Sequence, residues 1–407
     1  MGLYFEQQHY DYDKYLYDIA KTGASHVGLV ISWYQKNVLA TDIGRHKTKT
    51  VSDARLIRTI HQARRRGLQV FLLPIVRLKQ RGPEDWRGVI KPKDMDKWWK
   101  SYRAYILHYA RLSRQHGVEL FSVGSELVSM EHHRQRWLSL VRAIRLLFPG
   151  PLIYSANWDH YKPVTFWDTL DYIGISNYYE LSKKVNPPVK TLRKAWIKIK
   201  KDIVKWKKKY PRIPLVFTEV GYYSQQGTNT YPWDYTREKP LSLEEQRRCY
   251  QAFTEAWDKS PNLQGVFFWN WFGKGGPKDT GYTPRGKPAE CVMRNWFGNI
   301  KKRELKRSFP KWLRTKKVGQ PVSPTTKKAK KQETNKSKPQ KAQPKAFDKR
   351  SAQQPKKGMQ SEKGNNRSKR TTSLPAKRAV PPKKPSSRTQ SKTQNRRTAP
   401  PKPRSQK

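Results

Sequence analysis

Short apolar runs alternate with longer amphipathic stretches over the first 300 residues of the chain. The runs are continuously apolar rather than alternately polar and apolar. Strands of this kind are typical of a sheet that is covered on both faces, which is what repeated strand–helix units produce. Eight such runs occur, at residues 2–6, 26–32, 69–76, 119–124, 151–156, 171–176, 214–219 and 265–270.

The stretches between these runs carry apolar residues at helical spacing. In residues 53–66, Ser52 and Asp53 supply a start signal and Gly67 a stop signal. Residues 96–115 present an aromatic stripe that we interpret as packing against the sheet: Trp98, Tyr102, Tyr105, Ile106 and Tyr109. Eight strand–helix units in about 300 residues predict a (β/α)8 barrel, or TIM barrel, of class α/β, with an open doubly wound sheet as the alternative.

The charge of the chain is unevenly distributed. Of 86 Lys and Arg and 31 Asp and Glu, 36 basic and four acidic residues fall in residues 301–407, a net charge of +32 there. From about Thr315 apolar residues are almost absent, so this segment cannot bury enough apolar surface to fold, and we expect disorder. The sequence therefore predicts a barrel domain (residues 1–300), a basic junction (301–314) and a disordered Lys-, Arg- and Pro-rich tail (315–407).

A polycationic tail binds polyanions through counterion release, with little sequence preference. Nucleic acid, an anionic envelope polymer and an acidic membrane surface are all suitable partners, and a solubilising extension is the simpler alternative. Beyond Trp312 the only aromatic residue is Phe347, which argues against a platform for stacking single-stranded nucleic acid.

The remaining composition excludes several classes of protein. Cys249 and Cys291 have no neighbours at metal-ligand spacing, so we expect reduced structural thiols and no metal or other cofactor. No run of about 18 apolar residues occurs, so no transmembrane segment is predicted. No signal peptide is visible. This favours the cytoplasm by default, whereas a start codon further upstream would allow secretion or attachment to the envelope. The sequence therefore predicts neither the compartment nor the oligomeric state.

Polar and aromatic residues collect where the predicted strands end. In a (β/α)8 barrel these ends form one rim, and the active site lies there. Glu126 follows the fourth run and Glu219 ends the seventh. Amides and large aromatic side chains stand at the other strand ends: Trp33, Asn157, Trp158, Asn177, Tyr178, Tyr179, Trp269 and Trp271.

This combination of residues suits the hydrolysis of a glycosidic bond. The reaction needs one carboxylic acid to protonate the leaving oxygen and a second carboxylate opposite it. We expect Glu126 and Glu219 to be this pair, at the separation of about 5–5.5 Å that gives retention of configuration. Aromatic faces would stack on the sugar rings while amides bind the hydroxyls, although any single one of these positions could equally be a filled rim site.

Several phrases of the sequence resemble glycoside hydrolase family 113. They include HVGLVISWYQ, FSVGSEL, LIYSANWD, LDYIGISNYY and PLVFTEVGYYS, in order between Gly2 and Gly298. The resemblance implies a retaining (β/α)8 barrel of clan A, in a family whose known members are mainly β-mannanases. It also implies that Glu126 of GSEL is the acid/base, that Glu219 of FTEVGY is the nucleophile, and that Tyr178 or Tyr179 holds the nucleophile by a hydrogen bond.

One position departs from the pattern of that clan. Asparagine commonly precedes the acid/base, whereas this chain has Ser125, which reaches less far toward a sugar 2-hydroxyl and leaves the preference for mannose open. We do not expect the other polar residues near the predicted strand ends to be catalytic. We expect Glu6 and Glu180 at most to support the site, Glu131 to be an ordinary helix or loop acid, and His132 and His133 to lie on the surface or in a subsite.

The leading hypothesis is a retaining glycoside hydrolase that acts on a β-linked polysaccharide or oligosaccharide, most simply of the β-mannan type. The first alternative is a carbohydrate-binding barrel with weak or no turnover. The second is a polyanion-binding protein whose function lies in the tail, residues 315–407. Which sugar is cut, and whether cleavage is internal or terminal, stays open at this point.

Overall fold

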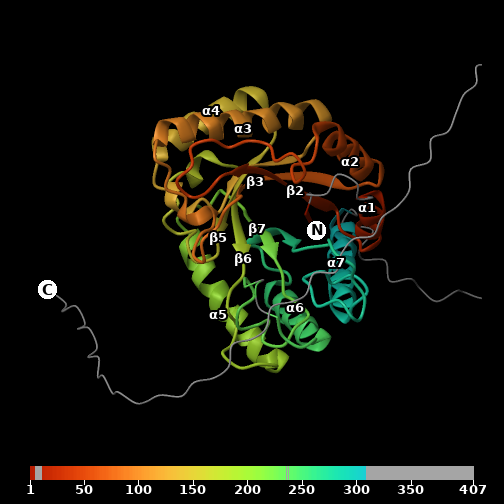
Figure 1. Ribbon diagram of the computed structural model, residues 1–407. Helices are drawn as coiled ribbons and strands as arrows, with labels where there is room; N and C mark the ends of the chain where they lie inside the picture. Colours follow the sequence, from red (N-terminus) through yellow and green to blue (C-terminus); the bar gives the residue numbers. More distant parts are fainter. Residues whose placement is uncertain (5–11, 235, 237, 309–407) are drawn as a thin grey trace, which may run out of the picture. The chain divides into compact units, whose positions relative to one another are not determined.

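The computed structural model describes residues 1–4, 12–234, 236 and 238–308, which contain eight parallel strands arranged as a barrel (Figure 1). The strands follow one another in chain order from β1 to β8, and each pairs in parallel with the next. Just after β8, the N–H of Trp271 donates to the carbonyl oxygen of Gly2 over 2.8 Å, so the barrel is nearly closed. The predicted fold class is confirmed, and the sequential strand order rules out a doubly wound sheet.

Each strand lies within three residues of its predicted bounds. The strands are β1 (Gly2–Tyr4), β2 (His26–Gln35), β3 (Gln69–Leu78), β4 (Leu120–Ser125), β5 (Leu152–Asn157), β6 (Tyr172–Asn177), β7 (Leu215–Val220) and β8 (Leu263–Phe268). The helices are α1 (Tyr12–Lys21), α2 (Asp53–Arg65), α3 (Met95–His116), α4 (Arg134–Leu147), α5 (Val189–Lys207), α6 (Leu243–Trp257) and α7 (Pro288–Ser308). Three short 3₁₀ helices interrupt the connections: η1 (Arg87–Val89), η2 (Val128–Met130) and η3 (Trp167–Thr169).

The ends of helices α2 and α3 follow from their capping residues. Ser52 accepts a hydrogen bond from the N–H of Arg55 over 3.3 Å, and Asp94 accepts one from the N–H of Lys97 over 3.0 Å. Such caps satisfy N–H groups that have no partner inside the helix. Helix α3 ends at Gly117, whose φ of 69° lies in the left-handed region that glycine adopts without steric penalty.

Apolar side chains form two cores, one on each side of the sheet. Along β2, Leu29 and Ile31 face the outer core, between strands and helices, whereas Val30 faces the barrel interior. The aromatic stripe of α3 belongs to the outer core, where Trp98 stacks on Tyr102 with ring centroids 5.0 Å apart, so its predicted packing role is confirmed. The inner core consists of Val30, Phe71, Leu73, Ile75, Leu120, Ile153, Val216 and Phe267.

In the described part of the chain, no helix combines the length and the apolar character needed to cross a membrane. Cys249 is buried, Cys291 is exposed, and both are free thiols. The predicted tail, residues 315–407, lies outside the described residues, and so does Glu6. The division of the chain into domain, junction and tail therefore stays a prediction.

Candidate active site

Glu126 and Glu219 lie at the carboxyl ends of two strands of the barrel. Glu126 directly follows β4, Glu219 is the penultimate residue of β7, and each has only 6% of its surface exposed. The charge of Glu126 contributes to raising the pKa of Glu219, so the two carboxyl groups are close enough to interact. The structure thus brings the two predicted carboxylates into one site.

Strand β4 stops at Ser125 because the backbone of Glu126 turns into the left-handed region, with φ of 51°. This conformation is uncommon for a residue with a side chain, and the surrounding structure has to hold it. The N–H of Glu126 donates to the carbonyl oxygen of Ser155, and the N–H of Leu127 donates to the hydroxyl of Tyr154, each over 2.8 Å. Hydrogen bonds on either side of the Glu126 Cα therefore fix the direction of its side chain.

Two side chains bind the Glu126 carboxylate. Arg87 in η1 donates from Nη2 to Oε2, and Ser176 in β6 donates from Oγ to Oε1. Burial lowers the pKa of Arg87, but the charges of Glu126 and Glu219 outweigh this effect and raise it, so Arg87 stays a cation. Neither residue was predicted from the sequence. Ser176 lies inside a strand, and the only signal for Arg87 is that it lies in a long connection, residues 79–94, which is a common place for functional residues.

Glu219 is held by Tyr178, whose hydroxyl donates to Glu219 Oε2 over 2.6 Å. Burial and the charge of Glu126 raise the pKa of Glu219 to about 8, against the opposing effects of the Tyr178 hydrogen bond and the Arg87 charge. Its surroundings therefore favour the protonated form of Glu219, while Arg87 pairs with Glu126.

Glu131 is not an ordinary loop acid, contrary to the sequence-based expectation. It directly follows η2 and is 1% exposed; its Oε1 accepts from the Tyr154 hydroxyl over 2.7 Å and its Oε2 lies 2.8 Å from Nδ1 of His160. Burial raises the pKa of the Glu131 carboxyl. Since Tyr154 also binds the N–H of Leu127, this buried pair supports the turn that carries Glu126.

Among the predicted aromatic residues, Tyr178 binds Glu219 itself and Trp269 contacts the strand that carries Glu219. Trp269 follows β8, its N–H donates to the carbonyl oxygen of Val220 over 2.7 Å, and a cis peptide bond joins it to Asn270. Its ring packs against the inner core and lies over Gly2, where an added Cβ would come within 2.9 Å of it. Trp269 therefore lies beside the end of the strand that carries Glu219.

Three predicted site residues are turned away from the glutamates or closed to solvent. Trp33 stacks on Tyr105 of α3 with centroids 4.8 Å apart, on the helix side of β2. Trp271 has no exposed surface and belongs to the outer core. Asn177 is also fully buried, and neither of its amide atoms has a hydrogen-bond partner among the described residues. Trp271 and Asn177 are therefore closed to solvent, whereas Trp33 is half-buried and lies on the helix side of its strand.

The last three predicted residues form a group beyond β5 and β6. Trp158 and Tyr179 are half-buried and contact each other edge to face, with centroids 5.0 Å apart. Asn157 donates to Asp159 over 2.7 Å. Glu180 is exposed, as is His132. The aromatic pair offers an apolar surface on the same rim as the glutamates, at the ends of the two strands that lie between β4 and β7.

The site can supply a proton, a buried carboxylate nucleophile and a cation, but no metal cluster. Among the residues that the structure describes, no three His, Cys, Asp or Glu side chains are placed so that they could hold a metal ion. A barrel of this topology with two interacting carboxyl groups at its strand ends, one of them bound by a tyrosine, is typical of glycoside hydrolases.

The comparisons with known proteins agree with this class. Residues 4–287 match the model of Glycoside Hydrolase Family 113, and the chain belongs to that family. The complex structure of a GH113 β-1,4-mannanase is similar at 26% identity and a TM-score of 0.65, covering 73% of this chain and 98% of that one. GH113 β-mannanase AaManA from Alicyclobacillus acidocaldarius, in complex with ManMIm, is similar at 28% identity and a TM-score of 0.66, covering 74% and 96%. No curated protein sequence matches.

Proposed function

We propose that this enzyme hydrolyses a β-1,4-linked polysaccharide of the mannan type with retention of configuration, using Glu126 as the acid/base and Glu219 as the nucleophile. The single observation that carries the assignment is the pair of buried, interacting carboxyl groups at the ends of β4 and β7. The similarity to structures described as GH113 β-1,4-mannanases supports the substrate class.

The reaction proceeds in two displacements. In the first, a carboxylate oxygen of Glu219 attacks the anomeric carbon while Glu126 gives its proton to the glycosidic oxygen, so the leaving sugar departs as an alcohol. In the second, Glu126 takes a proton from water, whose oxygen attacks the anomeric carbon and releases Glu219. The hydrogen bond from Tyr178 occupies Oε2 of Glu219 and leaves Oε1 for the attack.

The surroundings of the two carboxyl groups have to change before the first displacement. Burial and the charge of Glu126 favour the protonated form of Glu219 and Arg87 binds Glu126, whereas attack needs an ionised Glu219 and a protonated Glu126. The productive state therefore forms when the proton moves from Glu219 to Glu126 and the contact with Arg87 is released. A sugar that enters between these side chains supplies the reason for both changes, because it separates the cation from the acid.

The choice of sugar rests on the residue before the acid/base. Ser125 is 1% exposed and its hydroxyl has no hydrogen-bond partner among the described residues. Ser125 can bind a sugar 2-hydroxyl only if the ring comes closer than it would to a longer amide side chain. The tail, residues 315–407, is proposed to tether the enzyme to a polyanion and to take no part in the chemistry.

The test is the release of reducing ends from β-mannans, β-glucans and xylans by the full chain, by Glu126→Gln and by Glu219→Gln. We expect cleavage of β-mannan and its loss in both variants, with the newly released end in the β configuration when it is followed by NMR. If no polymer is cleaved but sugar binding is measurable, the carbohydrate-binding barrel replaces this proposal. An inverted product would contradict the role of Glu219 as nucleophile.

A further inference from the structure

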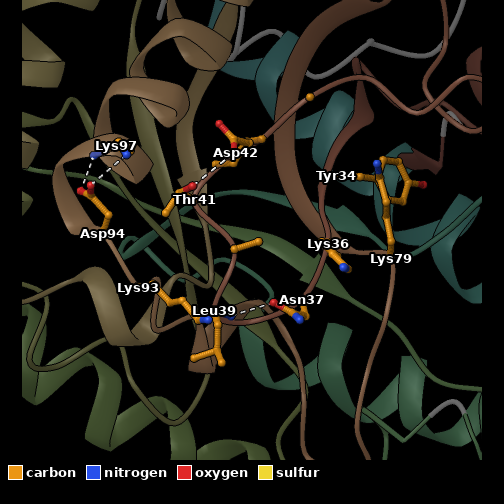
Figure 2. Close-up of a pocket in the computed structure, with 13 residues that line it drawn as sticks. Tyr34, Lys36, Asn37, Leu39, Thr41, Asp42, Lys79, Lys93, Asp94 and Lys97 are labelled. Atoms are coloured by element: carbon orange, nitrogen blue, oxygen red, sulfur yellow. Dashed lines mark hydrogen bonds and ion pairs between the residues drawn. The ribbon is translucent and has the colours of Figure 1, made fainter.

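An open groove with a volume of about 710 Å³ lies beside the carboxyl ends of β2 and β3 (Figure 2). We call it the lysine groove, because Lys36, Lys79, Lys93 and Lys97 line it together with two acidic residues, Asp42 and Asp94. Lys36 and Lys79 directly follow the two strands and lie near Tyr34, whereas Lys97 and Asp94 lie at the opposite end of the view.

The positive charge of this groove is only partly neutralised. Asp94 pairs with Lys97 at 3.7 Å and caps α3, so it does not form an ion pair with any of the other three lysines. The amino groups of Lys36, Lys79 and Lys93 have no acidic partner within the described part of the chain, and all three side chains are exposed. A groove that holds several unpaired cations favours an anionic ligand.

The lysine groove and the candidate active site share one stretch of chain. The connection between β3 and α3 begins with Lys79, carries Arg87 in η1 and contains Lys93 near its end. It is fixed to the connection after β2 by backbone hydrogen bonds, among them the N–H of Lys93 to the carbonyl oxygen of Leu39 over 3.0 Å. A polymer bound at Glu126 and extending along this connection would therefore meet the lysines.

Arg87 itself has donor capacity that the site does not use. Its Nη2 binds Glu126, but its Nε is buried and has no hydrogen-bond partner among the described residues. A guanidinium group binds a carboxylate or a phosphate through two parallel N–H groups, and a neutral sugar hydroxyl cannot match this geometry. An acidic substituent would give Arg87 a second partner when it leaves Glu126.

We propose that the natural substrate is an anionic polysaccharide, a β-linked chain that carries carboxylate or phosphate groups, and that the lysine groove and Arg87 bind these groups. This inference rests on the proposed glycosidase function and specifies its substrate. The charge of the domain agrees with it, since residues 1–300 hold 50 basic and 27 acidic residues. Such a field raises the local concentration of an anionic polymer.

The test compares three forms of one polymer: neutral β-1,4-mannan, the same mannan with part of its C6 hydroxyls oxidised to carboxylates, and a phosphorylated mannan. Reducing-end release is measured with the full chain, with a Lys36→Gln/Lys79→Gln/Lys93→Gln variant, and with a control of equal charge change. The control is Lys194→Gln/Lys198→Gln/Lys201→Gln, three exposed lysines on α5, outside the barrel. All three proteins keep the tail, so its contribution is constant.

We expect KM on an acidic mannan to be roughly tenfold lower than on neutral mannan for the wild type and for the α5 control. The groove variant should lose most of this difference. Whether the carboxylated or the phosphorylated polymer gives the lower KM identifies the acidic group. Equal behaviour of the groove variant and the control, or an equal KM on neutral and acidic polymers, overturns the proposal.

Failure of the glycosidase function is separable from failure of this inference. If the wild type cleaves none of the polymers, the same proteins are compared by electrophoresis through gels that contain neutral or acidic mannan. Retardation of the α5 control by acidic mannan, and a clearly smaller retardation of the groove variant, supports the lysine groove as an anionic polymer site. Equal retardation of the two variants overturns it.

Discussion

Arg87 and Glu126 form a hydrogen-bonded ion pair at the centre of the candidate active site, although they lie 39 residues apart in the chain and on different connections of the barrel. The pair places a cation beside one carboxyl group, while the other, that of Glu219, lies buried beside Tyr178. Environments that differ in this way push the pKa values of neighbouring acids apart. The distribution of protons in the site therefore depends on Arg87.

Replacement of Arg87 by glutamine should shift the pH dependence of hydrolysis. The charge of Arg87 lowers the pKa of Glu219, so its removal raises that pKa further above its ordinary value of 4.5. The acidic limb of kcat/KM against pH, which reports ionisation in the free enzyme, should move to higher pH by about one unit. The matched control is Arg58→Gln, an exposed arginine of α2. An unchanged limb would show that Arg87 does not act on Glu219.

Tyr178→Phe should weaken the nucleophile without disturbing the fold. The lost hydrogen bond to Glu219 is one that favours the ionised carboxylate, and bonds to charged groups contribute about 1.5–3 kcal/mol. We therefore expect kcat to fall by roughly 10- to 100-fold, with the Glu219 pKa raised further. The control is Tyr250→Phe, which removes a buried hydroxyl with no partner among the described residues. Equal losses in both variants would assign the effect to packing.

The order and type of the strands could be predicted from the sequence because buried parallel strands are continuously apolar. The same reasoning placed Glu126 and Glu219 at one rim, since all strands of such a barrel point the same way. It failed for Trp33 because β2 continues to Gln35, three residues past its predicted end, which leaves Trp33 inside the strand with its side chain on the helix face. Successive side chains of a strand point to opposite faces of the sheet. Whether Trp33 lies at the rim or on the helix face therefore depends on where the strand ends.

Arg87 could not be predicted for a different reason. Its place beside Glu126 results from the path of a long connection, which is set by backbone hydrogen bonds to the segment after β2 and not by any local pattern. Glu131 was misjudged in a similar way. Its burial depends on Tyr154 and His160, both of which come from a neighbouring strand and the loop after it.

Glu126→Gln and Glu219→Gln should disable different halves of the reaction. With an aryl β-glycoside whose leaving group needs no acid, Glu126→Gln should still form the glycosyl enzyme but hydrolyse it slowly, by a factor of roughly 10²–10⁴. Azide, which needs no general base, should restore turnover and give the β-glycosyl azide. The control is Glu219→Gln, which cannot form the intermediate, so azide should not restore a retained product. Rescue in the opposite variant would exchange the two assignments.

The buried Glu219 should make the folded protein less stable as the pH rises, and Glu219→Gln should remove this dependence. Burial and the charge of Glu126 raise the pKa of Glu219 from 4.5 to about 8 in the folded state. Below pH 4.5 both the folded and the unfolded chain hold the proton, so the free energy of unfolding does not depend on this group. Between pH 4.5 and 8 only the unfolded chain releases it, and the free energy of unfolding falls by at most about 1.4 kcal/mol per pH unit.

Glutamine at position 219 cannot ionise, so the variant should keep its stability through this window. Thermal unfolding between pH 4 and 9 should therefore give similar midpoints for the wild type and the variant at pH 4, and a higher midpoint for the variant at pH 8. Glu238→Gln, which changes an exposed acid, provides the control and should follow the wild type. If the difference between wild type and Glu219→Gln does not grow with pH, Glu219 does not hold a proton in the folded enzyme. The proton then needs no transfer to Glu126 before attack.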